Sequence, residues 1–284
     1  MTLPNPIVHH PFAYNIGSFG ITGFGLAVLL CFLVGQAVAQ RELARRGHDP
    51  EPVSDMVFGA VIGGLLGAKL YYVVVLGHYD AIFERGGFVF WGGLFGGILA
   101  VMLVAKKKHF PLMRIFDVGG PACAAAYAVG RTGCWAVGDD YGRPYTGLLS
   151  VAFPNGAPPS TAGVMAQEFG IPVAPGVSPS TVLSVYPTQL LEVAMGLVMF
   201  GFLWRIRDHK HADGWLFGVY CVLAGVERFI VEFFRAKDDR VVFGALTYAQ
   251  VIAVGVMAFG VAWMLWRAKP RPGAPGIYAA ELTG

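Results

Sequence analysis

Residues 130–145 read GRTGCWAVGDDYGRPY and combine residue types that could bind a phosphate group and move a proton. The segment carries Arg131, Arg143, Asp139 and Asp140, and it directly follows PACAAAYAV, a run apolar enough to lie in lipid. A charged side chain inside a membrane helix costs about 2.5–3.5 kcal/mol on insertion scales, so it faces protein or water and is a functional candidate. The forked guanidinium group of arginine matches the oxygens of a phosphate. We therefore interpret this segment as part of an anion-binding site at the end of a membrane helix.

A second charged set lies in GVERFIVEFFRAKDD, residues 225–239. Arg228, Glu232 and Arg235 are spaced i, i+4 and i+7, which places them on one face of a helix. We expect the arginines to contact a substrate and Glu232 to orient them. The alternative is a structural Arg–Glu–Arg ladder that only holds helices together.

The stretch YPTQLLE, residues 186–192, contributes Gln189 and Glu192, which are i, i+3 neighbours and point the same way. The start of a helix accounts for Pro187 and Thr188, but it does not account for Glu192 one turn deeper. Lys69 lies in another apolar stretch, at a similar predicted depth. These groups gather at one level of the membrane, the headgroup level, where the most available phosphate is that of a phospholipid. In FWGGLFGG the glycines, which include Gly92 and Gly93, would let a lipid or another backbone approach closely.

The composition is that of a membrane protein. The chain has 284 residues, of which 55% are hydrophobic and 14% charged, and its mean hydropathy is +0.57. A net charge of +3 is too small to indicate a nucleic-acid partner. The first Lys or Arg is Arg41, so we expect no cleaved signal peptide. The cysteines lack metal-ligand spacing, so we expect no metal and interpret them as small core residues, with Cys134 left open: Cys31, Cys123, Cys134 and Cys221.

The fold prediction is an all-α, polytopic membrane protein with about seven spans, because a helix needs about 20 apolar residues to cross the hydrocarbon. The predicted spans are residues 16–39, 53–76, 88–105, 115–137, 186–204, 215–234 and 244–266. Residues 1–284 then form a single transmembrane domain. Residues 138–185, rich in Pro, Gly, Ser and Thr, are too polar to span, and we expect them to form an insert between the fourth and fifth spans, either as a small ordered cap or as a floppy loop.

The distribution of Lys and Arg predicts the orientation, since cytoplasmic loops carry an excess of both. These residues gather in alternate connections and in the tail, which places the N-terminus and the insert outside and the C-terminus in the cytoplasm. The basic residues that carry this prediction are Arg41, Arg45, Arg46, Lys106, Lys107, Lys108, Arg114, Arg205, Arg207, Lys210, Arg267, Lys269 and Arg271.

The motifs together resemble the prolipoprotein diacylglyceryl transferase family. Residues 130–145 resemble the family motif GR-x-G-N-F-x-N-G-E-x-x-G-R-P. The resemblance continues through ITGFGLAVLLCFLVG, GGLLGAKLYYV, GGFVFWGGLFGG, YPTQLLE and GVERFIVEFFRAKDD, in the family's order and over nearly the whole chain.

The resemblance implies transfer of the diacylglyceryl group of phosphatidylglycerol to the lipobox cysteine thiol of a preprolipoprotein, the first step of bacterial lipoprotein maturation. It implies a multi-pass protein of the bacterial cytoplasmic (inner) membrane, with its active site toward the outer leaflet. The implied partners are phosphatidylglycerol, the lipobox cysteine and membrane lipids, and no cofactor is implied.

Carried over position by position, Arg131 and Arg228 correspond to essential arginines of the family, and Glu232 matches a family acid. We predict Arg131, Arg228 and Asp139 as catalytic. The predicted substrate-binding residues are Arg131, Arg143, Arg228, Arg235, Lys69, Glu232, Gln189, Glu192, Gly92, Gly93 and Trp91.

The sequence departs from the family pattern at several positions. Trp91 stands at a position often occupied by histidine, Cys134 at a usual asparagine and Asp139 at a usual glutamate. Phe24 replaces a tyrosine, and Lys69 replaces a frequent arginine. Since the histidine is missing, we predict Asp139 as the substitute proton acceptor and expect Trp91 to pack beside the lipid entrance.

Two other function classes compete with transfer. A non-catalytic membrane protein that binds lipid headgroups or lipoproteins would keep the arginines and lack the base. A transporter would place ionisable groups near the midplane or at both levels, whereas here they gather at one level, and no internal repeat is visible.

Overall fold

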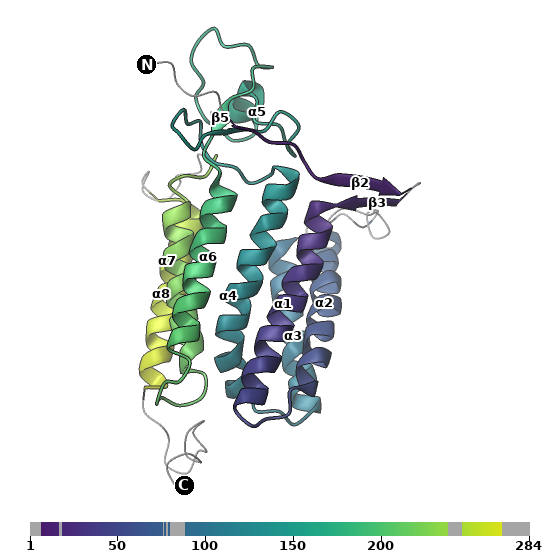
Figure 1. The fold of residues 1–284 in the computed structure, drawn as a ribbon, viewed down its shortest axis with the longest axis vertical. Coiled ribbons are helices and arrows are strands. Elements are labelled where there is room, and N and C mark those ends of the chain that lie inside the picture. The colour runs from purple at the N-terminus through teal and green to yellow at the C-terminus, as the bar shows by residue number, and fades with distance from the viewer. Residues whose placement is uncertain are drawn as a thin grey trace.

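A computed structural model describes residues 7–16, 19–75, 77, 79, 89–237 and 246–268. Within these residues, seven long helices run side by side in a bundle (Figure 1). They are α1 (Gly23–Arg45), α2 (Glu51–Leu70, continued by a π-helical turn, η1, at Tyr71–Val75), α3 (Phe90–Lys107), α4 (Leu112–Val137), α6 (Thr188–Arg205), α7 (Trp215–Val231) and α8 (Tyr248–Trp266). The prediction of a mostly helical membrane protein is therefore confirmed.

Four of the described helical segments are long and apolar enough to cross a membrane by length and composition. They are Gly23–Arg45, Glu51–Val75, Phe90–Lys107 and Tyr248–Trp266. Large apolar side chains lie exposed on the outside of the bundle, where lipid would cover them: Leu29, Phe58, Leu66, Val198 and Leu265 are each more than half exposed. The central helix α4 packs against α1, α6 and α7 and carries many of the buried small residues.

The first helix begins later than the sequence predicts. The prediction placed its start at residue 16, but β2 (Ala13–Ile16) and β3 (Phe19–Thr22) form an antiparallel hairpin, and α1 begins at Gly23. The Thr22 side chain caps the helix by accepting a hydrogen bond from the Gly25 amide at 3.2 Å. An apolar run cannot reveal such a boundary by itself, because Ile16, Phe19 and Ile21 continue the apolar residues of the helix into the hairpin.

Glycines bring α2 and α3 into close contact. A Cβ atom at Gly63 would lie 2.6 Å from the carbonyl oxygen of Gly96, and one at Gly67 would lie 2.9 Å from the Cα of Gly96. Neither position leaves space for a side chain, so the glycines allow the two backbones to touch. For the glycines of FWGGLFGG, the close approach of another backbone is one of the two possibilities that the sequence analysis gives.

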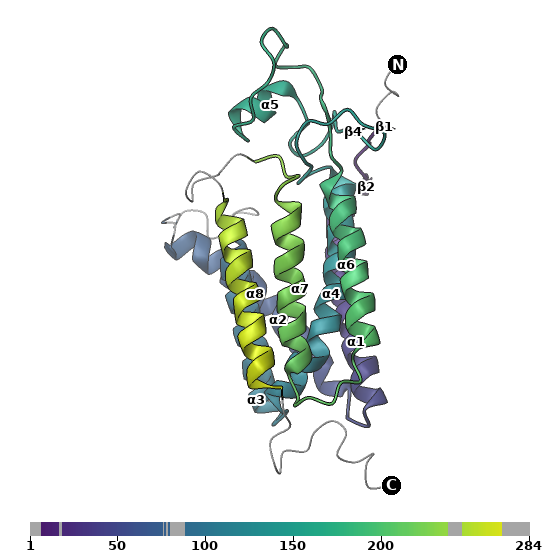
Figure 2. The same cartoon turned by 90° about the vertical axis from the view of Figure 1, so that its left-hand side faces the viewer.

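Residues 138–185 form a cap over one end of the bundle (Figure 2). The cap contains β4 (Val151–Ala152), α5 (Ala162–Gln167) and β5 (Ser184–Val185). Strand β4 pairs with β5 in antiparallel fashion and with the N-terminal strand β1 (Ile7–Val8) in parallel. The cap has its own apolar core, formed by Tyr141, Val151, Phe153, Met165, Ile171, Val185 and Ala236.

The two ends of the bundle differ in charge. The cap and β1 lie at one end, and the C-terminal end of α8 lies at the other (Figure 1). The α1–α2, α3–α4 and α6–α7 connections lie at the end opposite the cap, with the basic residues of those connections and Arg267. Lys269 and Arg271 fall outside the described residues.

Candidate functional site

The candidate site lies directly beneath the cap, where α4 and α7 end and α6 begins. Helix α4 ends at Gly138, whose φ of 72° is the left-handed conformation that favours glycine. Two residues in the first turn of α6 hold the backbone of Asp139 and Asp140, which follow Gly138. Thr188 Oγ1 donates to the carbonyl oxygen of Asp140 at 2.6 Å, and Gln189 Nε2 donates to that of Asp139 at 2.5 Å. Asp140 itself has a φ of 54°, so the turn is strained as well as anchored.

Asp140 joins two arginines that are far apart in the sequence. Its Oδ2 accepts from Arg131 Nη1 at 2.9 Å, and its Oδ1 accepts from Arg235 Nη2 at 2.6 Å. Arg131 also contacts Glu192 on α6 and donates to Cys134 Sγ at 3.2 Å. Asp140 therefore links α4 to the segment that follows α7, and Arg131 links α4 to α6. The Asp140 side chain is 38% exposed.

Glu232 lies between Arg228 and Arg235. Arg228 Nη2 lies 2.7 Å from Glu232 Oε2, and Arg235 Nε lies 3.9 Å from the same atom. The Glu232 side chain is 1% exposed, whereas that of Arg228 is 34% exposed. The buried acid thus holds a cation that remains partly exposed. The i, i+4 spacing predicts the pair of Arg228 and Glu232, but α7 ends at Val231, so Arg235 lies beyond the helix and the single helical face predicted for all three residues is wrong. We call Arg131, Asp140, Glu192, Arg228, Glu232 and Arg235 the arginine cluster.

Two arginines in this cluster keep unused donors. Within the described part of the chain, Arg131 Nε and Arg228 Nη1 are buried and have no hydrogen-bond partner. Buried guanidinium donors without partners are costly, and an anionic ligand would satisfy them. The cluster can therefore accept an anion such as a phosphate.

The adjacent carboxyl groups Asp139 and Asp140 have opposite environments. Burial raises the pKa of Asp139 above its ordinary value, and a hydrogen bond with Cys134 offsets only part of that effect. Burial alone would also raise the pKa of Asp140, but Arg235 and Arg131 outweigh it and hold that pKa below its ordinary value. Asp139 Oδ1 has no hydrogen-bond partner among the described residues. Asp139 is thus the stronger base of the two carboxylates, and Asp140 the weaker one.

The fold also brings together a group that the sequence does not reveal. Cys134, Asp139 and Asp140 offer ligand atoms within 4.8 Å of one another, a spacing that could hold a metal ion, although the cysteine spacing alone predicts no metal cluster. Arg131 and Arg235 already contribute the positive charge that the Asp140 carboxylate requires. The donor set is therefore used for ion pairing and does not fit a dedicated metal site.

Arg143 contacts the backbone after α7, and its predicted contact with the substrate stays a prediction. Its Nε donates to the carbonyl oxygen of Arg235 at 3.0 Å and its Nη2 to that of Lys237 at 2.8 Å. Beside it, a side chain at Gly142 would collide with Tyr186 and Thr188, at 2.7 and 2.9 Å. The structure therefore places Arg143 in a clamp that fixes the chain after α7 to the cap.

The remaining predicted residues lie on α2 and α3. Gly92 is buried against Tyr71 and the α2 backbone, and Gly93 faces Ala68 at 3.5 Å, so helix packing accounts for both. Trp91 is 40% exposed and lies against Phe90 and Phe95 at the cap end of α3. Lys69 lies half-buried in the last turn of α2.

Sequence reasoning did not assign Asp140 a role and did not single out Glu227 or Tyr127. Tyr127 OH donates to Glu227 Oε1 at 2.8 Å and lies 3.4 Å from Glu192 Oε1, one helical turn below Arg131. Glu227 was detectable, because an acid within an apolar helix is unusual. Nothing in the sequence marks Tyr127, since its partner lies on another helix.

Comparisons with known proteins show which proteins this chain is similar to. The family model described as prolipoprotein diacylglyceryl transferase matches residues 11–266. A protein of Clostridium tetani named phosphatidylglycerol–prolipoprotein diacylglyceryl transferase is 28% identical over 258 residues, covering 88% of this chain and 95% of the relative. Proteins with the same name from Nitratidesulfovibrio vulgaris (strain Miyazaki F) and Xanthomonas oryzae pv. oryzae (strain PXO99A) are each 30% identical, over 279 and 267 residues. These matches cover 93% and 89% of this chain, and 96% and 89% of the relatives.

Proposed function

The chain belongs to the prolipoprotein diacylglyceryl transferase family, and from this premise we propose that it transfers the diacylglyceryl group of phosphatidylglycerol to the lipobox cysteine thiol of a preprolipoprotein at the arginine cluster. The observation that carries the choice of site is the pair of buried, unpartnered guanidinium donors, Arg131 Nε and Arg228 Nη1. They lie beneath the cap, where a lipid headgroup would reach them.

The reaction changes the charge on the phosphate, and this change explains the need for arginines. The thiolate sulfur attacks the glyceryl carbon that bears the phosphate ester, a C–S bond forms, and the C–O bond to the phosphate breaks. The electron pair of that bond leaves with glycerol phosphate, so the phosphate gains a second negative charge. Guanidinium groups already in place stabilise this charge more in the transition state than in the bound lipid.

Arg131 and Arg228 are proposed to hold the phosphate, and Asp140 is proposed to give way to it. Asp140 is the most exposed acid of the cluster, since its side chain is 38% exposed against 3% for Glu192 and 1% for Glu232. It can therefore turn toward solvent when phosphate takes its place beside Arg131. Glu192 and Glu232 stay buried and keep Arg131, Arg228 and Arg235 oriented, while Gln189 holds the backbone of the acidic turn.

Asp139 is proposed to take the proton from the incoming thiol. Its unpartnered Oδ1 is available to that proton, and burial makes it a stronger base than an ordinary aspartate. This assignment compensates for Trp91, which stands where the family often has histidine. We propose that Trp91, with its aromatic neighbours, lies beside the path by which lipid enters.

We further propose seven membrane spans, with the cap outside and the C-terminus in the cytoplasm, in a single transmembrane domain of the bacterial inner membrane. The concentration of basic residues at the end opposite the cap supports this orientation. The arginine cluster would then lie toward the outer leaflet.

The test is transfer in vesicles that contain the purified protein, phosphatidylglycerol with labelled acyl chains and a lipobox peptide. We expect a labelled thioether peptide and release of glycerol phosphate, both lost in Arg228→Ala. Arg205→Ala is the matched control, because Arg205 is exposed at the opposite end of the bundle. Binding of phosphatidylglycerol without any transfer by the natural sequence would favour the non-catalytic alternative, and equal transfer by Arg228→Ala would remove the reaction from this cluster.

A further inference from the structure

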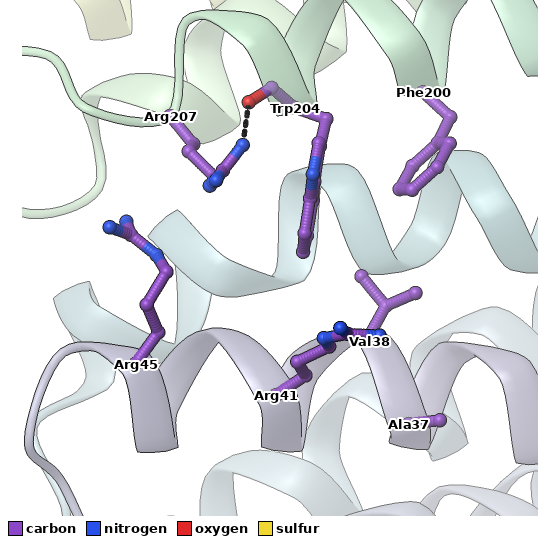
Figure 3. Close-up of a pocket in the computed structure, with 7 residues that line it drawn as sticks. All are labelled: Ala37, Val38, Arg41, Arg45, Phe200, Trp204 and Arg207. Carbon is purple, nitrogen blue, oxygen red and sulfur yellow. Dashed lines mark hydrogen bonds between the residues drawn. The ribbon is translucent and has the colours of Figure 1, made fainter.

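A cavity of about 670 Å³ lies at the end of the bundle opposite the cap, far along the helices from the arginine cluster (Figure 3). It opens between α1 and α6, the two helices on either side of α4 (Figure 1). Its lining combines three arginines with an apolar wall: Arg41, Arg45, Arg207, Ala37, Val38, Phe200 and Trp204. Its volume is in the range of small-molecule sites.

The arginines of this cavity are not neutralised by the acids that contact them. Glu42 is completely buried, and it is shared by Arg45 at 2.7 Å, Arg46 at 2.7 Å and Arg207 at 3.4 Å. Arg45 has one further acid, Asp208 at 2.7 Å. The cavity therefore retains excess positive charge.

Arg41 supplies that excess most directly. It is exposed, and in the described part of the chain no acid pairs with it. Arg207 is held in place, since its Nη1 donates to the Trp204 carbonyl oxygen at 2.5 Å and its Cζ lies 4.3 Å from the centre of the Trp204 ring. Figure 3 shows Arg45 rising from α1 toward Arg207, while the Arg41 side chain lies along α1 beside Val38.

We propose that this cavity binds the headgroup of an anionic phospholipid, with the guanidinium groups on the phosphate and an acyl chain along Ala37, Val38 and Phe200. The occupant is a lipid because the cavity joins a basic rim to an apolar wall at the end of membrane-embedded helices. Basic pockets between membrane helices on the cytoplasmic side are a recurring form of lipid recognition. The site is separate from the transfer reaction, and it takes a lipid from the opposite leaflet.

The test maps where a photoreactive lipid attaches. The protein is placed in bilayers that contain a diazirine-bearing phosphatidylglycerol or, in parallel, a diazirine-bearing phosphatidylcholine, and labelled peptides are identified by mass spectrometry. We expect the anionic probe to label residues 37–45 and 200–207 about fivefold more than the zwitterionic probe, which corresponds to about 1 kcal/mol for one basic side chain. Equal labelling by the two probes would overturn the proposal.

Two variants and a matched control locate the site. Arg41→Gln removes the unpaired cation, and Ala37→Trp fills the cavity from an exposed position, so both should lose the preference for the anionic probe. Arg205→Gln removes an exposed arginine that lies at the same end but does not line the cavity, so this variant should keep the preference for the anionic probe. Unchanged labelling in both test variants would overturn the proposal. Competition by free glycerol 3-phosphate would also overturn it, by showing that the cavity takes a soluble phosphate ester. Because the readout is labelling, the result does not depend on transfer at the arginine cluster.

Discussion

At the scale of single residues, Arg228 combines a fixed position with an open donor. Glu232 holds its Nη2 at 2.7 Å, while its Nη1 has no hydrogen-bond partner among the described residues. An arginine held in this way keeps one guanidinium nitrogen available to donate to a ligand. The same reasoning applies to Arg131, which is held by Asp140 and Glu192 and keeps its Nε unused.

We predict that Arg228→Ala and Arg131→Ala each lower transfer by at least about 10²–10³, the usual effect of removing one donor to a developing anion. Arg228→Lys should recover little of this loss, because an ammonium group cannot keep Glu232 and also fork onto the phosphate. Glu232→Gln should cost less than Arg228→Ala, since Glu232 orients the arginines. The measurement is the rate of thioether formation in vesicles. A glutamine variant as inactive as the alanine variant would instead give Glu232 a direct chemical role.

The predicted pH dependence of transfer rests on Asp139. Because burial raises the pKa of Asp139, its basic form is lost as pH falls through a value above the ordinary range for aspartate, and transfer should fall with it. Asp139→Asn should slow transfer by about 10²–10⁴ at neutral pH. The variant should recover partly as pH rises toward the thiol pKa of about 8.5.

The control for this prediction is Glu168→Gln, which removes an exposed carboxylate of the cap and should leave the pH profile unchanged. Rates of thioether formation between pH 5 and 9 distinguish the cases. An Asp139→Asn enzyme with the natural rate and profile would assign the proton transfer to another group.

The residue scale also shows what the sequence can and cannot predict. Arg131, Arg228 and Glu232 were predictable, because charges in apolar helices are costly and their spacing identifies a shared face. The different roles of Asp139 and Asp140 were not predictable. They follow from the left-handed turn at Gly138 and from hydrogen bonds donated by Thr188 and Gln189, and these partners become neighbours only in the folded bundle.

At the scale of elements, glycines in similarly apolar helices have different surroundings. Gly96 on α3 has the backbone of α2 against it, whereas Gly201 on α6 has no atom within 4 Å of the position of a Cβ. Hydropathy predicts the helices that contain them, but it cannot show which glycine faces a neighbour. Helix α1 illustrates the same limit, since its true start depends on a hairpin and on the Thr22 cap.

Two alanine substitutions test this difference. Gly96→Ala should destabilise the protein by about 1–3 kcal/mol, because the added methyl group forces α2 and α3 apart. Gly201→Ala should stabilise it by about 0.5–1 kcal/mol, because alanine loses less conformational entropy than glycine in a helix. Thermal unfolding in detergent, compared at one protein concentration, measures both. A neutral Gly96→Ala would mean that the α2–α3 contact is looser than the structure shows.

At the scale of the whole molecule, the two ends of the bundle differ in their balance of acidic and basic residues. The cap end holds buried acids and arginines in balance, while the opposite end carries the excess of Lys and Arg. The helix bundle and its cap could be predicted in outline from apolar runs and loop charges. The pairing of the N-terminal strand with the cap could not, because a two-residue strand has no distinctive pattern.

The orientation is predicted to be cap outside and C-terminus inside. A reporter that is active only outside the cell should be active when inserted at Gly176, an exposed turn in the cap with no atom within 4 Å of the position of a Cβ. The same reporter should be inactive after Gly284. The reverse pattern would place the arginine cluster toward the cytoplasm and would contradict the proposed access to the outer leaflet.

The parallel pairing of β1 with β4 also determines the order in which the protein can be completed. Ile7 precedes α1 in the chain, yet its partner Val151 follows only after α1, α2, α3 and α4 have been synthesised. At about 5–20 residues per second, the strand that contains Ile7 waits roughly 7–29 s for its partner. The cap therefore assembles late, from segments delivered at separate times to one side of the membrane, and the acidic turn at Asp139 and Asp140 gains its anchors on α6 only when translation has passed the cap.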